Sequence, residues 1–329
     1  MATSSMKSTL RGLPPGLPRI DATTALPYVV LVLLVITTMA LQGRVSLDAF
    51  SNLPDTTLPL ILVGLGETIV ILSRGIDLSV GGIMSLSTAL VATHVTTNKS
   101  IVLGLILVAA VGALAGALNG LLIVITGIQP FIVTLATWSI TGGVALQVLP
   151  TEGGTVAPNL VSGLSGSVGP ASKSLIIIVT LIAIWLYLRR TRFGVSLYAT
   201  GSSEKAAVLN GLRASRVTVI VYACSGLASA LAGIYFAVLT SSGSPTAGNP
   251  YILDSIAAVV IGGTSLAGGR GGFVPTVVGG FILAAIGTVV FYANMSSYWS
   301  TLGTGLILLI TVMLYGIVGL VQSRRRSGG

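Results

Sequence analysis

The 329-residue chain is 53% hydrophobic and only 8% charged, and its net charge is +9. Soluble domains carry about 25% charged residues, so this composition excludes a water-soluble enzyme and a disordered chain. A single cysteine and a single histidine exclude a disulfide framework and a Cys/His metal cluster. The composition therefore predicts a polytopic membrane protein, and the question becomes where its 17 Lys and Arg residues lie.

Apolar segments recur along the chain at lengths close to what a membrane requires, which is roughly 20 residues per helix. Ten candidate spans follow, at residues 26–42, 57–73, 78–93, 101–125, 131–149, 174–188, 217–239, 251–264, 273–293 and 301–321. The runs at 78–93 and 251–264 are short and interrupted by glycine, so we expect broken or re-entrant helices there. The predicted fold class is all-α, with a membrane domain over 26–321 between a cytoplasmic leader at 1–25 and a basic cytoplasmic tail at 322–329.

The basic residues predict the orientation, because short cytoplasmic loops retain Lys and Arg. If the N-terminus is inside, Arg44, Lys99 and Lys173 are the only basic residues in segments that would lie outside. Most of the others fall in the leader, the tail and the segment 189–216. The sequence thus predicts that both termini are cytoplasmic, that the first span is a retained signal anchor, and that the net charge needs no nucleic-acid partner.

Two predicted loops are long. Residues 150–173 are rich in Gly, Ser and Pro and predict an external loop without a core of its own. In the cytoplasmic segment 189–216, Ser202 and Ser203 precede the stretch EKAAVL and Gly211 follows it, an order typical of an N-cap, a two-turn helix and a glycine stop. So short a helix is not stable alone in water, so we expect it to pack against a partner protein or the membrane interface.

Three carboxylates fall in or beside apolar runs. Glu67 lies within the run LPLILVGLGETIVIL, where an ionisable group is a functional-site candidate by default; a hydrogen-bonded Glu that locks neighbouring helices is an equal alternative. Asp77 sits at a break between two runs, where it suits an N-cap with Arg74 as a possible ion-pair partner, or a gate. Asp254 occupies the position of Glu67 in a weak internal repeat.

A cluster of polar residues surrounds the turn between the fourth and fifth predicted spans: Asn119, Gln129, Thr134, Thr137 and Trp138. Hydroxyls, amides and an indole ring suit a neutral polyhydroxylated ligand, because sugars offer many hydrogen-bonding groups and apolar ring faces. The same side chains also suit hydrogen bonds between helices. The scarcity of charge along the spans favours a neutral or zwitterionic cargo over ions.

Several sequence motifs of nucleotide-binding proteins and hydrolases are missing. The chain has no GxxxxGK[ST] loop for ATP phosphates, and it has no GxSxG elbow to accompany its sole histidine, His94. These features favour a transporter or channel over an enzyme. The row Gly112, Gly116 and Gly120 has the spacing that lets two helices approach closely, and we expect it to serve packing.

Four strings in order carry a resemblance to a known family. They are GIDLSVGGIMSLS (75–87), IQPFIVTLAT (128–137), RTRFGVSLYATGSSEKAAVLNGL (190–212) and DSIAAVVIGGTSLAGGRGG (254–272). Together they resemble the permease subunits of bacterial ABC importers for ribose, xylose, arabinose, galactofuranose and similar sugars, over about residues 27–320. The GIDLSVG form favours sugar over the related branched-chain amino-acid permeases, which remain the first alternative; a self-sufficient secondary carrier is the second.

The resemblance implies a location in the bacterial inner membrane and a set of partners. These are a second permease subunit, identical or not, membrane lipid, an extracytoplasmic sugar-binding protein, and a cytoplasmic ATPase that holds ATP and Mg²⁺, so this chain would bind no cofactor itself. It also implies that the loop 189–216 docks into the ATPase. The coupling surface would comprise Phe193, Gly194, Tyr198, Gly201, Glu204, Ala206, Ala207 and Gly211. The family usually has a glycine pair and then Asn before the Glu/Ala stretch, whereas this chain reads Gly201-Ser202-Ser203.

Overall fold

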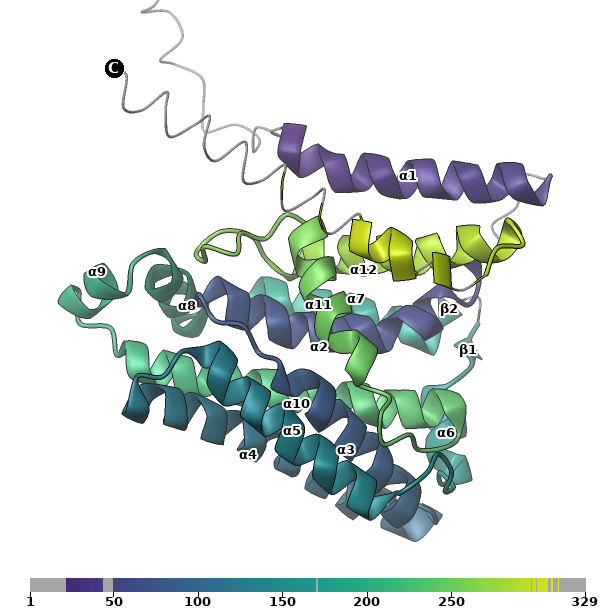
Figure 1. Ribbon diagram of the computed structural model, residues 1–329, viewed down its shortest axis with the longest axis horizontal. Coiled ribbons are helices and arrows are strands. Elements are labelled where there is room, and N and C mark those ends of the chain that lie inside the picture. The colour runs from purple at the N-terminus through teal and green to yellow at the C-terminus, as the bar shows by residue number, and fades with distance from the viewer. Residues whose placement is uncertain are drawn as a thin grey trace, which may run out of the picture.

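A computed structural model describes residues 22–43, 50–169, 171–296, 298–299, 301–306, 309 and 313 of the chain. The fold is helical, as predicted, and most of the long helices run side by side along one direction (Figure 1). The helices are α1 (Ala22–Gln42), α2 (Leu53–Leu72), α3 (Ser79–His94), α4 (Ile101–Thr126), α5 (Pro130–Val148), α6 (Pro158–Leu164), α7 (Lys173–Leu188), α8 (Arg192–Ser202), α9 (Glu204–Leu209), α10 (Ala214–Thr240), α11 (Asn249–Ile261) and α12 (Phe273–Tyr292).

The number of full-length spans is smaller than ten in the described part of the chain. Five helical stretches are long and apolar enough to cross a membrane, namely α2, α4 with the turn before it, α5, α10 and α12. A sixth span would be α7 together with α8, a pair bent by 77°. The two short runs of the sequence correspond to the two short helices α3 and α11, of 16 and 13 residues. The predicted span 301–321 and the tail 322–329 lie largely or wholly outside the described residues, as do residues 1–21 of the leader.

Helix α2 forms the centre of the bundle. Within its apolar window 83% of the residues are buried, against 22% for α4 and for α5. Leu58, Ile61 and Leu72 of α2 are fully buried together with Tyr222 of α10 and Phe273 of α12. The outward faces of α4 and α5 instead carry exposed Leu, Ile and Val side chains. Soluble proteins rarely expose so large an apolar area to water. These faces therefore suit lipid or another membrane subunit.

The glycine row of α4 packs against α10, as the sequence predicts. A methyl group at Gly116 would overlap the carbonyl oxygen of Tyr222, and one at Gly112 would overlap the backbone of Gly226. A methyl group at Gly120 would lie 2.7 Å from the Cα of Val219. The absence of a side chain at these positions thus allows α4 and α10 to approach more closely than larger residues permit.

The loop 150–173 has no core of its own, but it packs on the bundle instead of standing free. It contains α6 and a small antiparallel hairpin, β1 (Ser167–Val168) and β2 (Ala171–Ser172), in which Val168 pairs with Ala171. Ala157 and Leu160 are buried against α3, α4 and α10. The Ala157 amide donates to the Val95 carbonyl at 2.9 Å, so the loop closes one end of the bundle.

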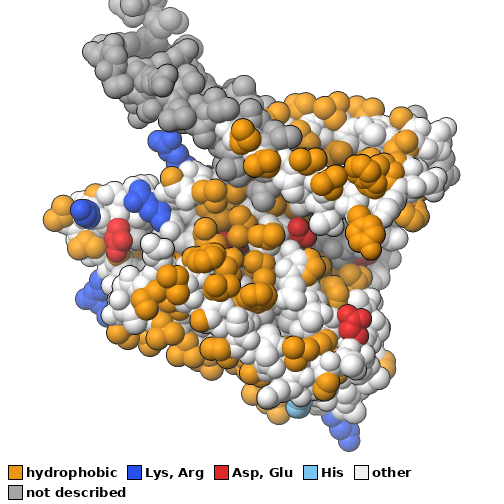
Figure 2. All heavy atoms as spheres, viewed as in Figure 1, with side chains coloured by type: hydrophobic (Ala, Val, Ile, Leu, Met, Phe, Trp, Pro, Cys, Tyr) orange, Lys and Arg blue, Asp and Glu red, His pale blue; other side chains and the backbone are white. Residues whose placement is uncertain are grey.

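The segment between α7 and α10 lies at the opposite end, where α8 and α9 project (Figure 1). Helix α9 is the predicted two-turn helix: the Ser203 hydroxyl accepts a hydrogen bond from the Ala206 amide, and Gly211 after it has a φ of 81°. Helix α8 was not expected from the sequence. Most of the Lys and Arg side chains on the face shown in Figure 2 gather at this α8–α9 end.

Candidate functional site

Several of the predicted polar residues meet at the break between α2 and α3. Asp77 is fully buried there, and its Oδ1 accepts hydrogen bonds from the amide and the hydroxyl of Ser79, at 3.0 and 2.5 Å. Its Oδ2 accepts a hydrogen bond from the Ser225 hydroxyl of α10, at 2.7 Å. Because Leu78 is the N-cap of α3, Asp77 lies one residue earlier than expected but still satisfies an amide of the first turn.

The hydrogen bonds continue from Asp77 to two more helices. Asn119 of α4, also fully buried, donates from Nδ2 to the Ser79 hydroxyl at 2.9 Å, and its Oδ1 accepts a hydrogen bond from the Thr137 hydroxyl of α5. Thr134 of α5 accepts a hydrogen bond from the Leu78 amide at 3.1 Å. We call this set, which joins α2, α3, α4, α5 and α10, the buried polar network. Buried polar groups require such partners, so in this state these side chains serve helix packing.

Glu67 joins the network from α2. It is fully buried, and its Oε1 accepts a long hydrogen bond of 3.4 Å from the Asp77 amide. Among the described residues, its Oε2 and the Tyr222 hydroxyl have no hydrogen-bond partner. Glu67 lies five residues before the end of α2, so it is in the half of that helix that leads to the α8–α9 end.

The ion pair between Arg74 and Asp77 was a wrong expectation. The Arg74 guanidinium turns to the other side and donates to the carbonyl oxygens of Gly201 at 2.7 Å and Ser202 at 2.6 Å, and also to that of Ala267. Asp77 is satisfied by hydroxyls and an amide instead. The two side chains lie in different surroundings, because Arg74 is exposed and Asp77 is buried.

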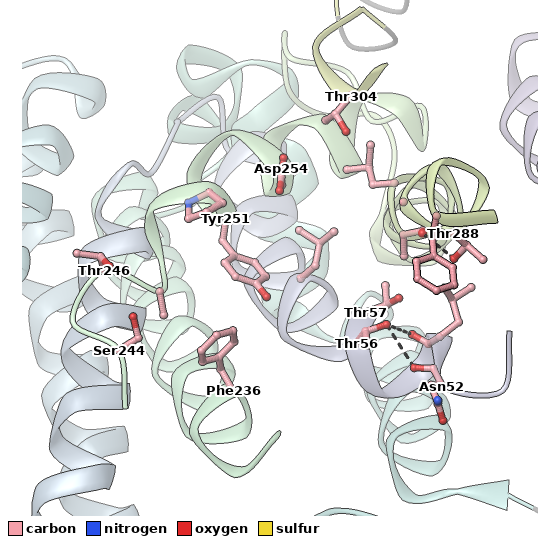
Figure 3. A pocket seen from close by; sticks show the side chains of 18 of the residues that line it. Asn52, Thr56, Thr57, Phe236, Ser244, Thr246, Tyr251, Asp254, Thr288 and Thr304 are labelled. Carbon is pink, nitrogen blue, oxygen red and sulfur yellow. Dashed lines mark hydrogen bonds between the residues drawn. The ribbon is translucent and has the colours of Figure 1, made fainter. Parts of the chain in front are cut away.

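A separate cavity of about 1110 Å³ lies between the start of α2, α10, the loop 241–248, α11 and α12. We call it the main cavity. Figure 3 shows side chains from these elements converging on it, with the Tyr251 ring projecting between Phe236 and Thr57. Its polar lining comprises Asn52, Thr56, Thr57, Glu152, Ser244, Thr246, Tyr251, Asp254, Thr288, Tyr292 and Thr304.

The lining of the main cavity combines hydroxyl groups with aromatic rings. Glu152 and Asp254 are its only charged residues, and none of the described residues that line it is Lys or Arg. Such a surface offers donors and acceptors to hydroxyl groups and flat apolar faces to carbon rings, while it repels anions. The volume exceeds what a single small molecule of this type fills, so the space suits passage as well as binding.

The predicted pathway residues thus separate into four places. Asp254 lines the main cavity, whereas Glu67, Asp77, Asn119, Thr134 and Thr137 belong to the buried polar network. Gln129 is exposed in a second pocket of about 440 Å³ beside α8 and α9. Trp138 donates from Nε1 to the Asn249 side chain at the start of α11, at 3.2 Å.

The hydroxyl residues of the main cavity were missed from the sequence. Ser244 and Thr246 stand in the polar segment SSGSPTAG between two spans, a signal that is visible in the sequence. Thr57 and Thr288 carry no such signal, because single threonines occur throughout apolar helices and bond to their own backbone, as Thr288 does with Ala284.

The predicted coupling residues divide between the inside and the outside of the α8–α9 end. Gly194, Gly201 and Ala207 are buried, and Phe193 and Tyr198 are half-buried. The Tyr198 hydroxyl donates to the Gly271 carbonyl at 2.8 Å. The exposed members are Glu204, Ala206 and Gly211.

Two exposed apolar residues of α9 were not singled out from the sequence. Leu209 is 87% exposed and Val208 is 53% exposed, and Lys205 and Arg213 stand exposed beside them. A large apolar side chain surrounded by charge at a projecting corner is typical of a protein contact site.

Among the described residues, no group of three or more His, Cys, Asp or Glu side chains is placed to hold a metal ion.

Comparisons with known proteins agree on one family. The family model described as "Branched-chain amino acid transport system / permease component" matches residues 50–312. The chain is 42% identical to a ribose import permease of Bacillus subtilis over 260 residues, which covers 77% of this chain and 80% of that protein. It is 34% identical to a fructose import permease of Rhizobium meliloti, covering 88% of this chain and 84% of the relative.

A third relative differs in its cargo. The chain is 31% identical to an autoinducer 2 import system permease of Yersinia pseudotuberculosis, over 86% of this chain and 83% of that protein. No solved structure is a significant match. The cargoes named for these three relatives are therefore ribose, fructose and autoinducer 2.

Proposed function

This chain belongs to the family of permease components of ABC importers, in its sugar-importing branch, and from this premise we propose that it imports a monosaccharide, a pentose, hexose or galactofuranose. It is a multi-pass membrane protein of the bacterial inner membrane. The observation that supports the cargo class is the main cavity, whose hydroxyl and aromatic lining suits a neutral polyhydroxylated molecule.

ATP hydrolysis is assigned to a partner, because the chain contains no loop for ATP phosphates. We place the contact with a cytoplasmic ATPase, which would hold ATP and Mg²⁺, at α9 and the exposed part of the segment 189–216. Leu209 and Val208 supply an apolar anchor there, and Glu204 and Lys205 supply charged groups at its rim.

Transport then requires alternating access. An extracytoplasmic sugar-binding protein delivers the cargo to the end closed by α6 and the β1–β2 hairpin, and ATP binding by the ATPases moves α9. Two ligands drive such a cycle only when each favours a different state of the same element. A second permease subunit and lipid would cover the exposed apolar faces of α4 and α5.

The proposed orientation places both termini, α8 and α9 in the cytoplasm, with ten membrane segments if the short helices α3 and α11 and the run 301–321 are included. The gathering of Lys and Arg at the α8–α9 end supports it (Figure 2). In a Cys224→Ala background, a membrane-impermeant maleimide applied to intact cells should label Val168→Cys in β1 and leave Leu209→Cys unlabelled. The reverse pattern would contradict this orientation.

The experiment that tests the function is affinity purification of the chain from its native membrane in mild detergent. We expect an ATPase subunit and an extracytoplasmic binding protein to co-purify. Leu209→Asp should remove most of the ATPase, whereas Val168→Asp, a matched change of a residue that is 60% exposed at the other end, should retain it. Recovery of the chain with no ATPase would contradict the proposal.

A second candidate is a branched-chain amino-acid importer, the class of transport system named in the description of the matching family. The two are separated by competition for uptake. Excess unlabelled ribose or fructose should reduce uptake of a labelled sugar in cells that express the complex, and excess leucine should not. Competition by leucine alone would favour the second candidate.

A further inference from the structure

Three separate parts of the chain meet at the end of α2. The Arg74 guanidinium, just after α2, donates from Nε to the carbonyl oxygens of Gly201 and Ala267, at 2.7 and 3.0 Å. Its Nη2 donates to the Ser202 carbonyl at 2.6 Å. Gly201 and Ser202 end α8, and Ala267 lies in the turn 265–271 between α11 and α12. We call this meeting point the Arg74 junction.

The backbones at the junction are in direct contact. The Gly269 amide donates to the Leu72 carbonyl at 3.0 Å, and a methyl group at Gly201 would overlap that same carbonyl oxygen. The Tyr198 hydroxyl of α8 donates to the Gly271 carbonyl at 2.8 Å. Three side-chain hydrogen bonds therefore fix α8 to the end of α2 and to the turn, and one more from a side chain and one from the backbone fix the turn to the end of α2.

Arg74 itself has a φ of 69°, which non-glycine residues rarely adopt. Such a conformation persists where the surrounding contacts over-determine it. The three carbonyl acceptors supply those contacts, so the arginine is held in one position.

The three parts that meet at the junction lead to different regions of the molecule. Helix α8 passes through Ser203 directly into α9. Helix α2 begins at the main cavity with Thr56 and Thr57, and the turn 265–271 joins α11, which carries Asp254, to α12, which carries Thr288. The junction thus connects α8 to three helices that line the main cavity, namely α2, α11 and α12.

We propose that the Arg74 junction is the rigid link that transmits movement of the ATPase-facing helix α9 to the walls of the main cavity, with Arg74 as its positioning residue. The proposal rests on the proposed function, because it assumes that an ATPase docks at α9. It adds the route by which that docking reaches the cargo, and it predicts that docking and transport can be separated.

The test is Arg74→Ala in the complex purified from native membranes and reconstituted in vesicles with the binding protein. The ATPase should co-purify at the wild-type ratio and still hydrolyse ATP, while uptake of labelled sugar falls about tenfold, a typical size for a coupling between two sites. The amount of ATP hydrolysed per sugar should rise accordingly. Arg270→Ala is the matched control, since it removes an equal charge from an exposed side chain on the same turn.

Several results of these measurements would overturn the proposal. Unchanged uptake and an unchanged ratio of ATP to sugar in Arg74→Ala would overturn it. Loss of the ATPase from the Arg74→Ala complex would also overturn it, because the junction would then support docking itself. Should Arg74→Ala fail to accumulate, Tyr198→Phe, which removes one bond between α8 and the turn, must raise the ratio to a smaller extent or the proposal fails. Absence of an ATPase from the wild-type preparation would instead contradict the proposed function.

Discussion

The buried polar network and the main cavity use the same kinds of residues in opposite ways. In the network, hydrogen bonds run from Thr137 to Asn119, from Asn119 to Ser79 and from Ser79 to Asp77, and Asn119 and Asp77 are fully buried. In the cavity, Asp254 and Thr288 stand on the wall of an open space. Helix α2 takes part in both, with Thr57 near its start and Glu67 near its end.

The difference shows that the role of a polar residue in a membrane helix depends on what its side chain faces. Where other helices supply the partner, the residue fixes the packing of the bundle. Where an open space faces it, the residue is available to cargo. Substitutions should therefore lower stability in the network and lower transport in the cavity.

Asp77→Ala should have the largest effect. It leaves the Ser79 amide and the Ser225 hydroxyl without their acceptor, and buried unsatisfied groups cost about 1–3 kcal/mol each. We expect a loss of about 3 kcal/mol in the free energy of unfolding, seen as a lower melting temperature in detergent. Asp77→Asn, which keeps an acceptor oxygen, should lose less. An unchanged melting temperature with abolished uptake would instead make Asp77 a gate.

Asp254→Asn should leave the melting temperature unchanged and lower uptake. The carboxylate accepts stronger hydrogen bonds from sugar hydroxyls than an amide does, and a difference of about 1.4 kcal/mol corresponds to about tenfold in uptake at low sugar concentration. Leu253→Ala, a change of the neighbouring exposed residue, serves as the control. Normal uptake in Asp254→Asn would remove this carboxylate from the pathway.

Thr288→Val should have the smallest effect, about threefold on uptake, because it removes one neutral hydrogen-bonding group from the cavity wall. Thr180→Val in α7 is the matched control, since both hydroxyls donate to the carbonyl four residues earlier and Thr180 lies outside the lining of the main cavity. Equal uptake in the two variants would mean that the Thr288 hydroxyl does not meet the cargo.

Much of the fold could be predicted from hydropathy and caps. The run 131–149 corresponds to α5 at Pro130–Val148, and the serine and glycine around EKAAVL located α9. Helix α8 was missed because its sequence RFGVSLYATGS mixes apolar and polar residues without a long apolar run. The burial of Ala157 and Leu160 could not be predicted either, because it depends on how the loop packs against α3 and α10.

The site was predicted less completely, for a related reason. Sequence identified Asp77 and Asn119 as unusual in an apolar setting, but the identity of their partners is a property of the folded bundle. Arg74 shows the limit most clearly. Its spacing suggested a bond to Asp77, whereas its acceptors are backbone carbonyls about 130 and 190 residues away in sequence.

The central claim is that this chain forms a sugar pathway driven by a separate ATPase. The most direct test measures uptake of labelled ribose and fructose into vesicles that contain either the chain alone or the chain with its co-purified ATPase and binding protein. We predict uptake that requires ATP and both partners, and none with the chain alone under an ion gradient. Uptake by the chain alone, driven by an ion gradient, would contradict the account.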